Sequence, residues 1–306
     1  MIYTVTLNPA IDYVVQLPQL QTGTINRNQA EAVQFGGKGI NVSGVLHNLG
    51  IENVALGFVA GFTGAGLEEG LRKQGLRTDF VHLSQGLTRI NVKVKADEET
   101  EINGIGPNIT QGDMDALYEK LARLAEGDHL VLSGSVPSCL GADTYEKLME
   151  AVAGKGVLVT VDATGMLLKN TLKHRPFLIK PNHHELEELF GTPLKSDEDM
   201  VSCGRRLQQM GARNVLISMA GDGAMLLDEN GAYHRVACPK GQVVNSVAAG
   251  DSMVAGFLAG YLERCDFAYA LKLGTAAGSA TAFCLGLGEK ETIYKLLEQE
   301  VPYGTI

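Results

Sequence analysis

Short apolar runs recur along the chain and predict the strands of a buried sheet. Six of them consist mostly of apolar and β-branched residues, at 2–7, 54–59, 129–133, 157–162, 177–180 and 214–219. A strand that helices cover on both faces has this composition, because neither face meets water. Segments with helical character lie between the runs, near 38–49, 112–125, 143–153, 184–190 and 197–210. This alternation predicts an α/β fold with a mainly parallel sheet between layers of helices.

Two regions do not follow the alternation. Residues 11–34 and 88–104 contain short strand-like runs in which polar and apolar positions alternate. They predict a small β-sheet lid inserted into the main body. Residues 250–284 are rich in Gly, Ala and Ser among apolar positions, which suits helices that pack closely. We expect one domain spanning 1–306, with the lid formed from about 11–34 and 88–104.

Composition and charge narrow the functional classes. The 306 residues include 26 Lys and Arg against 35 Asp and Glu, which gives a net charge of −9. A protein of this sign lacks the basic footprint of nucleic-acid binding. The five cysteines are scattered without CxxC spacing, which favours a reducing compartment. No apolar run reaches the roughly 18 residues of a membrane span. We expect a cytoplasmic protein that binds neither nucleic acid nor membrane.

Two turns rich in small residues precede predicted helices. The first is 36–41 (GGKGIN) and the second is 245–251 (NSVAAGD). Backbone N–H groups at the start of a helix favour a bound anion. From the spacing alone the first turn could be a plain loop. Asp251 could equally cap its helix or serve as a base beside a bound anion.

Together these turns resemble the two signatures of the ribokinase-like sugar kinases, also called the phosphofructokinase B family. Four further segments match motifs of that family in the same order: 6–12 (TLNPAID), 133–137 (SGSVP), 180–185 (KPNHHE) and 218–224 (SMAGDGA). The resemblance implies a three-layer α/β/α sandwich with a small β-sheet lid. It also implies ATP as phosphate donor, Mg²⁺ as cation, and a homodimer formed through the lids.

Within the family, residues 88–93 (TRINVK) and 100–104 (TEING) resemble the 1-phosphofructokinase branch. That branch implies phosphorylation of fructose 1-phosphate at its 6-hydroxyl to give fructose 1,6-bisphosphate. Kinases of tagatose 6-phosphate or fructose 6-phosphate share most of these motifs and remain alternatives. A catalytically silent sugar-phosphate sensor is an alternative from another class. A dehydrogenase is disfavoured, because the chain lacks the GxGxxG fingerprint.

The resemblance implies a role for each matching residue. Asp251 would take the proton from the sugar hydroxyl as that oxygen attacks phosphorus. Backbone N–H groups of Ala249, Gly250 and Asp251 would stabilise the developing charge on the transferred group. The predicted catalytic turn comprises Ala248, Ala249, Gly250 and Asp251.

The sugar-phosphate side draws on the first turn and on the lid. A carboxylate such as Asp12 can accept from two hydroxyls, although it could instead cap a turn. Positions 89, 91 and 93 share one face of a strand, which could be solvated or could cover the sugar. Ser133 could contact the sugar or belong to a structural turn. The residues predicted on this side, with Lys38 and Arg89 as the main phosphate binders, are Asp12, Arg27, Gly36, Gly37, Lys38, Asn41, Arg89, Asn91, Lys93 and Ser133.

The nucleotide side is implied by the later motifs. Asn182 and Glu185 form an Asn-x-x-Glu pattern that the resemblance associates with Mg²⁺, and oxygen ligands suit a hard cation. The residues predicted to border the nucleotide are Lys180, Asn182, Ser218, Ala220, Gly221, Gly223 and Gly250.

Ala220 and Ala248 stand where the family usually has glycine. Alanine adopts α and β conformations readily but is penalised at positive φ. If either turn needs a positive φ, nucleotide affinity or turnover should suffer. At the catalytic turn we expect an ordinary conformation, in which Ala248 is harmless.

Overall fold

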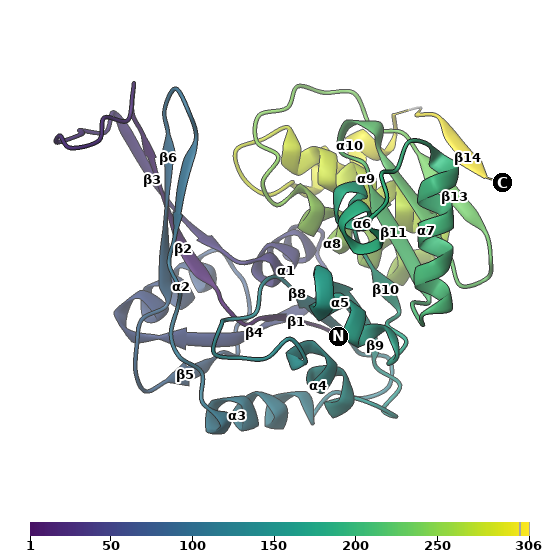
Figure 1. The fold of residues 1–306 in the computed structure, drawn as a ribbon, viewed down its shortest axis with the longest axis horizontal. Helices are drawn as coiled ribbons and strands as arrows, with labels where there is room; N and C mark the ends of the chain where they lie inside the picture. The colour runs from purple at the N-terminus through teal and green to yellow at the C-terminus, as the bar shows by residue number, and fades with distance from the viewer. Residues whose placement is uncertain (300, 306) are drawn as a thin grey trace.

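A ten-stranded sheet runs through the computed structural model, which describes residues 1–299 and 301–305 (Figure 1). Seven neighbouring strands are parallel, and three antiparallel strands extend one edge. In spatial order the strands are β5 (Val81–Leu83), β4 (Asn53–Ala60), β1 (Ile2–Thr6), β8 (His129–Ser133), β9 (Leu158–Asp162), β10 (Leu178–Ile179), β11 (Asn214–Ser218), β12 (Ala224–Leu227), β13 (Tyr233–Val236) and β14 (Tyr303–Thr305).

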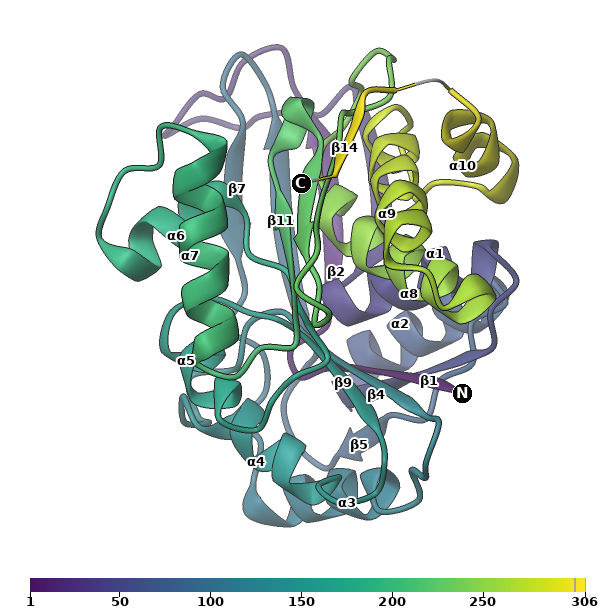
Figure 2. The same ribbon diagram turned by 90° about the vertical axis from the view of Figure 1, so that its right-hand side faces the viewer.

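Helices cover both faces of this sheet, as Figure 2 shows with α7 on one side of β11 and α9 on the other. One face carries α1 (Lys38–Asn48), α2 (Gly61–Lys73), α8 (Ala249–Arg264), α9 (Phe267–Ala282) and α10 (Lys290–Leu297). The other carries α3 (Gln111–Leu121), α4 (Thr144–Ala151), α5 (Gly165–Leu172), α6 (His183–Phe190) and α7 (Asp197–Gln209). The predicted three-layer sandwich is therefore confirmed.

The strand β8 shows why the core runs are continuously apolar. Leu130 and Leu132 pack into the core beneath α3 and α4, whereas Val131 packs into the core beneath α1 and α8. Successive side chains of a strand point to opposite faces. Since both faces are covered, every position is buried and no polar alternation arises.

A second, four-stranded sheet stands away from the body, at the upper left of Figure 1. Its order is β3 (Ala30–Gly36), β2 (Ala10–Gln16), β6 (Arg89–Lys95) and β7 (Thr100–Asn103). β2 and β6 are parallel, and the outer pairs are antiparallel. This small sheet comes from the two regions in which the sequence pattern predicts it.

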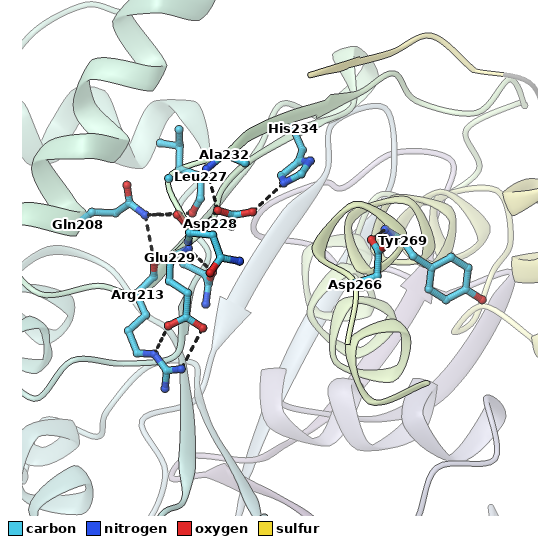
Figure 3. Close-up of polar contacts among 12 residues, drawn as sticks. Gln208, Arg213, Leu227, Asp228, Glu229, Ala232, His234, Asp266 and Tyr269 are labelled. Atoms are coloured by element: carbon cyan, nitrogen blue, oxygen red, sulfur yellow. Dashed lines mark hydrogen bonds and ion pairs between the residues drawn. The ribbon is translucent and has the colours of Figure 1, made fainter. Parts of the chain in front are cut away.

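A polar network fixes the hairpin that joins β12 to β13 (Figure 3). Asp228, which is 3% exposed, accepts from the backbone N–H of Ala232 at 2.8 Å and contacts His234 Nε2 at 2.9 Å. Nearby, Arg213 makes two bonds of 2.6 and 3.0 Å to Glu229. These hydrogen bonds satisfy polar groups of the turn and stabilise the antiparallel edge of the sheet.

In the part of the chain that the structure describes, no helix combines the length and apolarity needed to cross a bilayer. All five cysteines lie in that part and are unpaired.

Candidate active site

Two cavities lie at the carboxyl ends of the parallel strands, and they meet at one carboxylate. The larger has a volume of about 610 Å³ and the smaller about 340 Å³. Lys38, Ala248 and Asp251 line both. Ligands of open α/β sheets bind at this edge, because the loops that follow the strands gather there. A group transferred from one cavity to the other would pass beside Asp251.

Asp251 lies in the first turn of α8 and is 5% exposed. Its Oδ2 accepts a hydrogen bond from Asn41 Nδ2 at 2.8 Å. No side chain caps α8, so the alternative of a purely capping role for Asp251 is wrong. Burial first, and the carboxylate of Asp162 second, raise the pKa of Asp251 to about 7. A carboxyl with this pKa can accept a proton near neutral pH.

The start of α8 offers free backbone donors beside this carboxyl. Among the described residues, the N–H groups of Gly250 and Asp251 have no protein acceptor. The N–H of Ala249 instead donates to Ser246 O at 3.3 Å. Two of the three donors predicted for the catalytic turn are therefore available, while the third is already used within the turn. A Cβ at Gly250 would lie 3.2 Å from Lys180 Nζ, so the ammonium group of Lys180 lies directly beside this turn.

A buried aspartate that the motifs did not single out joins the two lysines of the site. Asp162 ends β9, is 2% exposed, and lies 3.3 Å from both Lys38 Nζ and Lys180 Nζ. Ser133 Oγ donates to the same carboxylate at 3.2 Å. Burial alone would raise the pKa of Asp162, but the two lysines outweigh it and lower the pKa. The only signal in the sequence is its place at the end of a core strand.

The carboxylates also act on Lys38. Burial would lower the pKa of the Lys38 ammonium, but Asp162 and Asp251 outweigh that effect and raise the pKa. Lys38 therefore carries its charge at neutral pH at the boundary between the cavities.

The small sheet supplies one wall of the smaller cavity. Asp12 and Asn91 face each other across β2 and β6, with Asn91 Nδ2 donating to Asp12 Oδ1 at 2.7 Å. Gly36, on β3, lies so close that a Cβ there would be 2.8 Å from Asp12 Oδ2. Asn91 is only 7% exposed, so the alternative of a solvated outer face is wrong for this position. Burial lowers the pKa of Arg89, with Asp12 opposing the shift.

Most of the remaining predicted residues on the sugar side also line the smaller cavity. These are Asp12, Gly37, Lys38, Asn41, Arg89, Asn91 and Ser133.

Two predicted phosphate binders do not lie at either cavity of this chain. Lys93 Nζ is paired with Glu101 at 2.9 Å. Arg27 is exposed and belongs to the loop between β2 and β3. That loop lies beyond Ala30, six positions along β3 from Gly36, which is about 20 Å for an extended strand. Within one chain the length of β3 separates Arg27 from the smaller cavity, and neither Arg27 nor Lys93 lines it, contrary to the expected placement.

The Asn-x-x-Glu pattern lies at the start of α6 and lines the larger cavity. Asn182 Oδ1 accepts from the Glu185 N–H at 2.8 Å, and Glu185 Oε2 accepts from the Asn182 N–H at 2.9 Å. The motif is thus a capping box. Glu185 Oε1 has no hydrogen-bond partner among the described residues, so one carboxylate oxygen remains available for a cation. Oxygen ligands with water are what Mg²⁺ prefers, and these residues fit it.

Comparison with known proteins identifies the family. The profile described as pfkB family carbohydrate kinase matches residues 5–293. A 1-phosphofructokinase of Bacillus subtilis (strain 168) is 48% identical over 299 residues, which cover 98% of each chain.

The chain belongs to the pfkB family of carbohydrate kinases.

Two further comparisons show how widely this pfkB kinase shares its architecture. A D-tagatose-1-phosphate kinase of Bacillus licheniformis is 39% identical, over 94% of this chain and 95% of the relative. The crystal structure of Escherichia coli phosphofructokinase-2 in complex with fructose-6-phosphate matches with a TM-score of 0.89 at 28% identity, over 97% of each chain. A tetrameric inhibited form of that enzyme is also among the solved structures.

The second turn of the larger cavity follows β11 of this pfkB kinase. Ser218 ends the strand, and the short 3₁₀ helix Ala220–Asp222 follows. Ser218, Ala220 and Gly221 line the cavity, together with the predicted Lys180, Asn182 and Gly250. Gly223 has φ +93° and closes the turn by accepting from the Met219 N–H at 2.9 Å, but it does not line the cavity.

Both alanines that replace glycine adopt left-handed backbone conformations. Ala220 has φ +48° and Ala248 has φ +65°. The expectation of an ordinary conformation at Ala248 was therefore wrong, because the turn into α8 needs a positive φ there. An L-residue in this region is disfavoured by about 1–2 kcal/mol.

Glycine at either position should stabilise the protein. Ala248→Gly and Ala220→Gly each remove the free-energy cost of a positive φ in the folded state. Part of this stabilisation is offset, because glycine also raises the conformational entropy of the unfolded chain. We expect each to raise the free energy of unfolding by about 0.5–1 kcal/mol, measured by urea denaturation. Ala116→Gly, inside α3, is the matched control and should lower it by about 1 kcal/mol. A loss of stability at both turns would contradict this account.

Proposed function

We propose that the protein transfers the γ-phosphoryl group of ATP to the 6-hydroxyl of fructose 1-phosphate, giving fructose 1,6-bisphosphate and ADP. The observation that carries the proposal is the position of Asp251, buried where the two cavities meet and with its pKa raised to about 7. The 48% identity with a 1-phosphofructokinase supports the choice of acceptor.

The smaller cavity suits the sugar phosphate. Its walls carry a carboxylate and amides for hydroxyl groups, at Asp12, Asn41 and Asn91. They also carry Arg89 for the phosphate already on the sugar, while Lys38 lies at the end of the cavity next to Asp251. Guanidinium binds phosphate through two parallel hydrogen bonds, whereas ammonium acts as a point charge. Its volume of about 340 Å³ falls in the usual range for a small-molecule site.

The larger cavity suits ATP, with its phosphates towards Asp251. Lys180 and the free N–H groups of Gly250 and Asp251 lie at that end. Groups fixed before the reaction stabilise developing charge without having to reorganise.

Phosphoryl transfer follows from this arrangement. The 6-hydroxyl oxygen attacks the γ-phosphorus while Asp251 takes the hydroxyl proton, and the bond to the ADP oxygen breaks. Lys38, at the boundary, balances charge on the transferred group. Glu185, oriented by its capping box with Asn182, would hold Mg²⁺, which when bound neutralises charge on the nucleotide phosphates.

The small sheet has a second face, and we propose that it forms a homodimer interface while the polar face serves as a lid. Val33, Tyr13, Val92 and Ile102 form one cross-strand row. Val33 is 54% exposed and Ile102 62%. A row of exposed apolar residues on a sheet marks an association surface. Sedimentation velocity should therefore show a dimer rather than a monomer. We also propose a cytoplasmic location, which the unpaired cysteines support.

An ADP-release assay tests the acceptor. Fructose 1-phosphate, tagatose 1-phosphate, fructose 6-phosphate and tagatose 6-phosphate would be compared by kcat/KM at saturating Mg-ATP. We expect fructose 1-phosphate to give the highest value, with tagatose 1-phosphate as the second candidate because of the 39% identical relative. A higher value for any of the other three sugar phosphates would overturn the acceptor. Binding of a sugar phosphate without ADP release would favour the sensor.

The pKa of Asp251 predicts the pH dependence of the reaction. Only the carboxylate can take the hydroxyl proton, so kcat/KM should rise about tenfold per pH unit below pH 7 and level off above it. The measurement is a profile of kcat/KM in buffers of constant ionic strength, from about pH 5.5 to about pH 8.5, a range that brackets the pKa of Asp251. The residual rate of Asp251→Asn should lack this rise, and a wild-type rate that stayed flat through pH 7 would contradict the assignment.

A further inference from the structure

We propose that Asn8 is a positioning residue for the acceptor, which fixes the small sheet and the guanidinium of Arg89 relative to the smaller cavity. The inference deepens the proposed function and rests on it, since the smaller cavity is taken to hold the sugar phosphate.

Asn8 lies where β1 of the large sheet leads into β2 of the small sheet. It lines the smaller cavity and is 7% exposed. Its main-chain oxygen accepts from Arg89 Nε at 3.1 Å, and its Nδ2 donates to Ile105 O at 3.1 Å. Arg89 begins β6, and Ile105 follows β7. One residue thus joins three segments that pass between the two sheets.

The carboxamide of Asn8 fits a slot that only glycine leaves open. A Cβ at Gly106, where φ is +91°, would lie 2.3 Å from Asn8 Oδ1. That oxygen is buried without a hydrogen-bond partner. An unpaired buried acceptor is unfavourable for folding alone. The bond from Nδ2 to Ile105, rather than satisfaction of the whole side chain, is therefore what the carboxamide contributes here.

The contact with the main-chain oxygen of Asn8 fixes the orientation of the Arg89 guanidinium. Nε is held by Asn8, whereas no acceptor among the described residues is bonded to either Nη. A guanidinium anchored at Nε presents its two Nη groups together, which is the arrangement that binds a phosphate bidentately. Movement of the Asn8 segment would displace this fork, because β6 begins at Arg89.

The variant Asn8→Ala tests the proposal, with Asn53→Ala as its matched control. Asn53 is 6% exposed, has an unpaired Oδ1 and donates from Nδ2 to backbone oxygens, but lines neither cavity. Asn8→Ala keeps the main-chain acceptor of Arg89 but removes the bond to Ile105 that holds this segment in place. We therefore expect KM for fructose 1-phosphate to rise about tenfold, as for one lost hydrogen bond, with kcat and KM for ATP unchanged. Asn53→Ala should lower thermal stability without changing either KM.

The double variant Asn8→Ala with Arg89→Gln distinguishes an effect exerted through Arg89 from an independent loss of structure or binding. If Asn8 acts through Arg89, KM for the sugar phosphate in the double variant should equal that of Arg89→Gln alone. Independent, multiplying effects would overturn the proposal, as would an unchanged KM in Asn8→Ala.

Hydrogen exchange supplies a readout that needs no substrate. Amides of β6 and β7 should exchange faster in Asn8→Ala than in the wild type, and Asn53→Ala should leave them unchanged. Unchanged exchange in Asn8→Ala would overturn the inference. If the wild type phosphorylates none of the sugar phosphates, the proposed function fails while exchange still decides the role of Asn8. If the wild type is active and Asn8→Ala keeps its KM, only the inference fails.

Discussion

Asp251→Asn is expected to lower kcat by about 10²–10⁴-fold while leaving the fold and sugar-phosphate binding intact. Asparagine has nearly the same shape as aspartate but cannot take the hydroxyl proton. The side chain would remain buried beside Asn41, which donates to Asp251 at 2.8 Å in the wild type. Steady-state turnover gives the first quantity, and calorimetric titration with fructose 1-phosphate gives the second.

The matched control is Asp266→Asn, at the start of the following helix (Figure 3). Asp266 caps α9 by accepting from the Tyr269 N–H at 2.8 Å. Asparagine caps a helix about as well as aspartate, so this variant should keep its stability and its kcat. If Asp251→Asn also turned over like the wild type, Asp251 would not be the base.

Asp251→Asn should also stabilise the folded protein, and the size of this effect should depend on pH. The pKa of Asp251 is raised from 3.8 to about 7 on folding. Between pH 3.8 and about pH 7 the folded state therefore keeps a proton that the unfolded state releases. The stability that this proton contributes is lost as the pH rises through about 7. Asp251→Asn should unfold at a higher temperature than the wild type at pH 8, and the difference should shrink towards pH 4.

Asp162→Asn is expected to lower the free energy of unfolding by about 3 kcal/mol. The carboxylate is 2% exposed and separates two ammonium groups, those of Lys38 and Lys180, at 3.3 Å each. Removing one charge from a buried ion pair leaves its partners uncompensated. The Lys38 side chain is 41% exposed and that of Lys180 only 6%, so most of the loss should come from Lys180. Urea denaturation measures the effect.

Glu101→Gln is the control for Asp162→Asn. It removes the partner of Lys93 from an ion pair in which Glu101 is 49% exposed. Exposed pairs contribute about 0–1 kcal/mol, so the loss should be small. Turnover should fall in Asp162→Asn, because Lys38 and Lys180 lose the group that places them. Equal stability losses in the two variants would contradict the role assigned to Asp162.

Periodicity predicted most of the fold because burial dictates it. The core strands and the helices α1, α3, α4, α6 and α7 lie where apolar runs and helical segments indicated them. The helix α2 was not predicted, since Gly61, Gly64, Gly66 and Gly70 disfavour a helix when tertiary packing is ignored. The antiparallel edge beyond β11 was also missed. Its strands β12 and β13 have four residues each, too few to show a period.

The site was predictable where a motif is local and not where it is assembled by the fold. Asp251, Asn41 and Glu185 belong to short motifs and lie at the cavities as expected. Asp162 ends an apolar strand, and its partner Lys38 is 124 residues away, so nothing near it in the sequence marks its role. The left-handed φ of Ala248 was equally hidden. The sequence shows an alanine, whereas the turn into α8 sets its conformation.

The most direct test of the central claim is the ³¹P NMR spectrum of fructose 1-phosphate incubated with Mg-ATP and the protein. We expect the γ-phosphate signal of ATP to decline as a second phosphomonoester signal grows on the sugar at carbon 6, with ADP formed in equal amount. Asp251→Asn should produce this change on a timescale longer by the same factor as its loss of kcat. A spectrum in which the sugar gains no second phosphate, or in which Asp251→Asn forms it as fast as the wild type, would contradict the account.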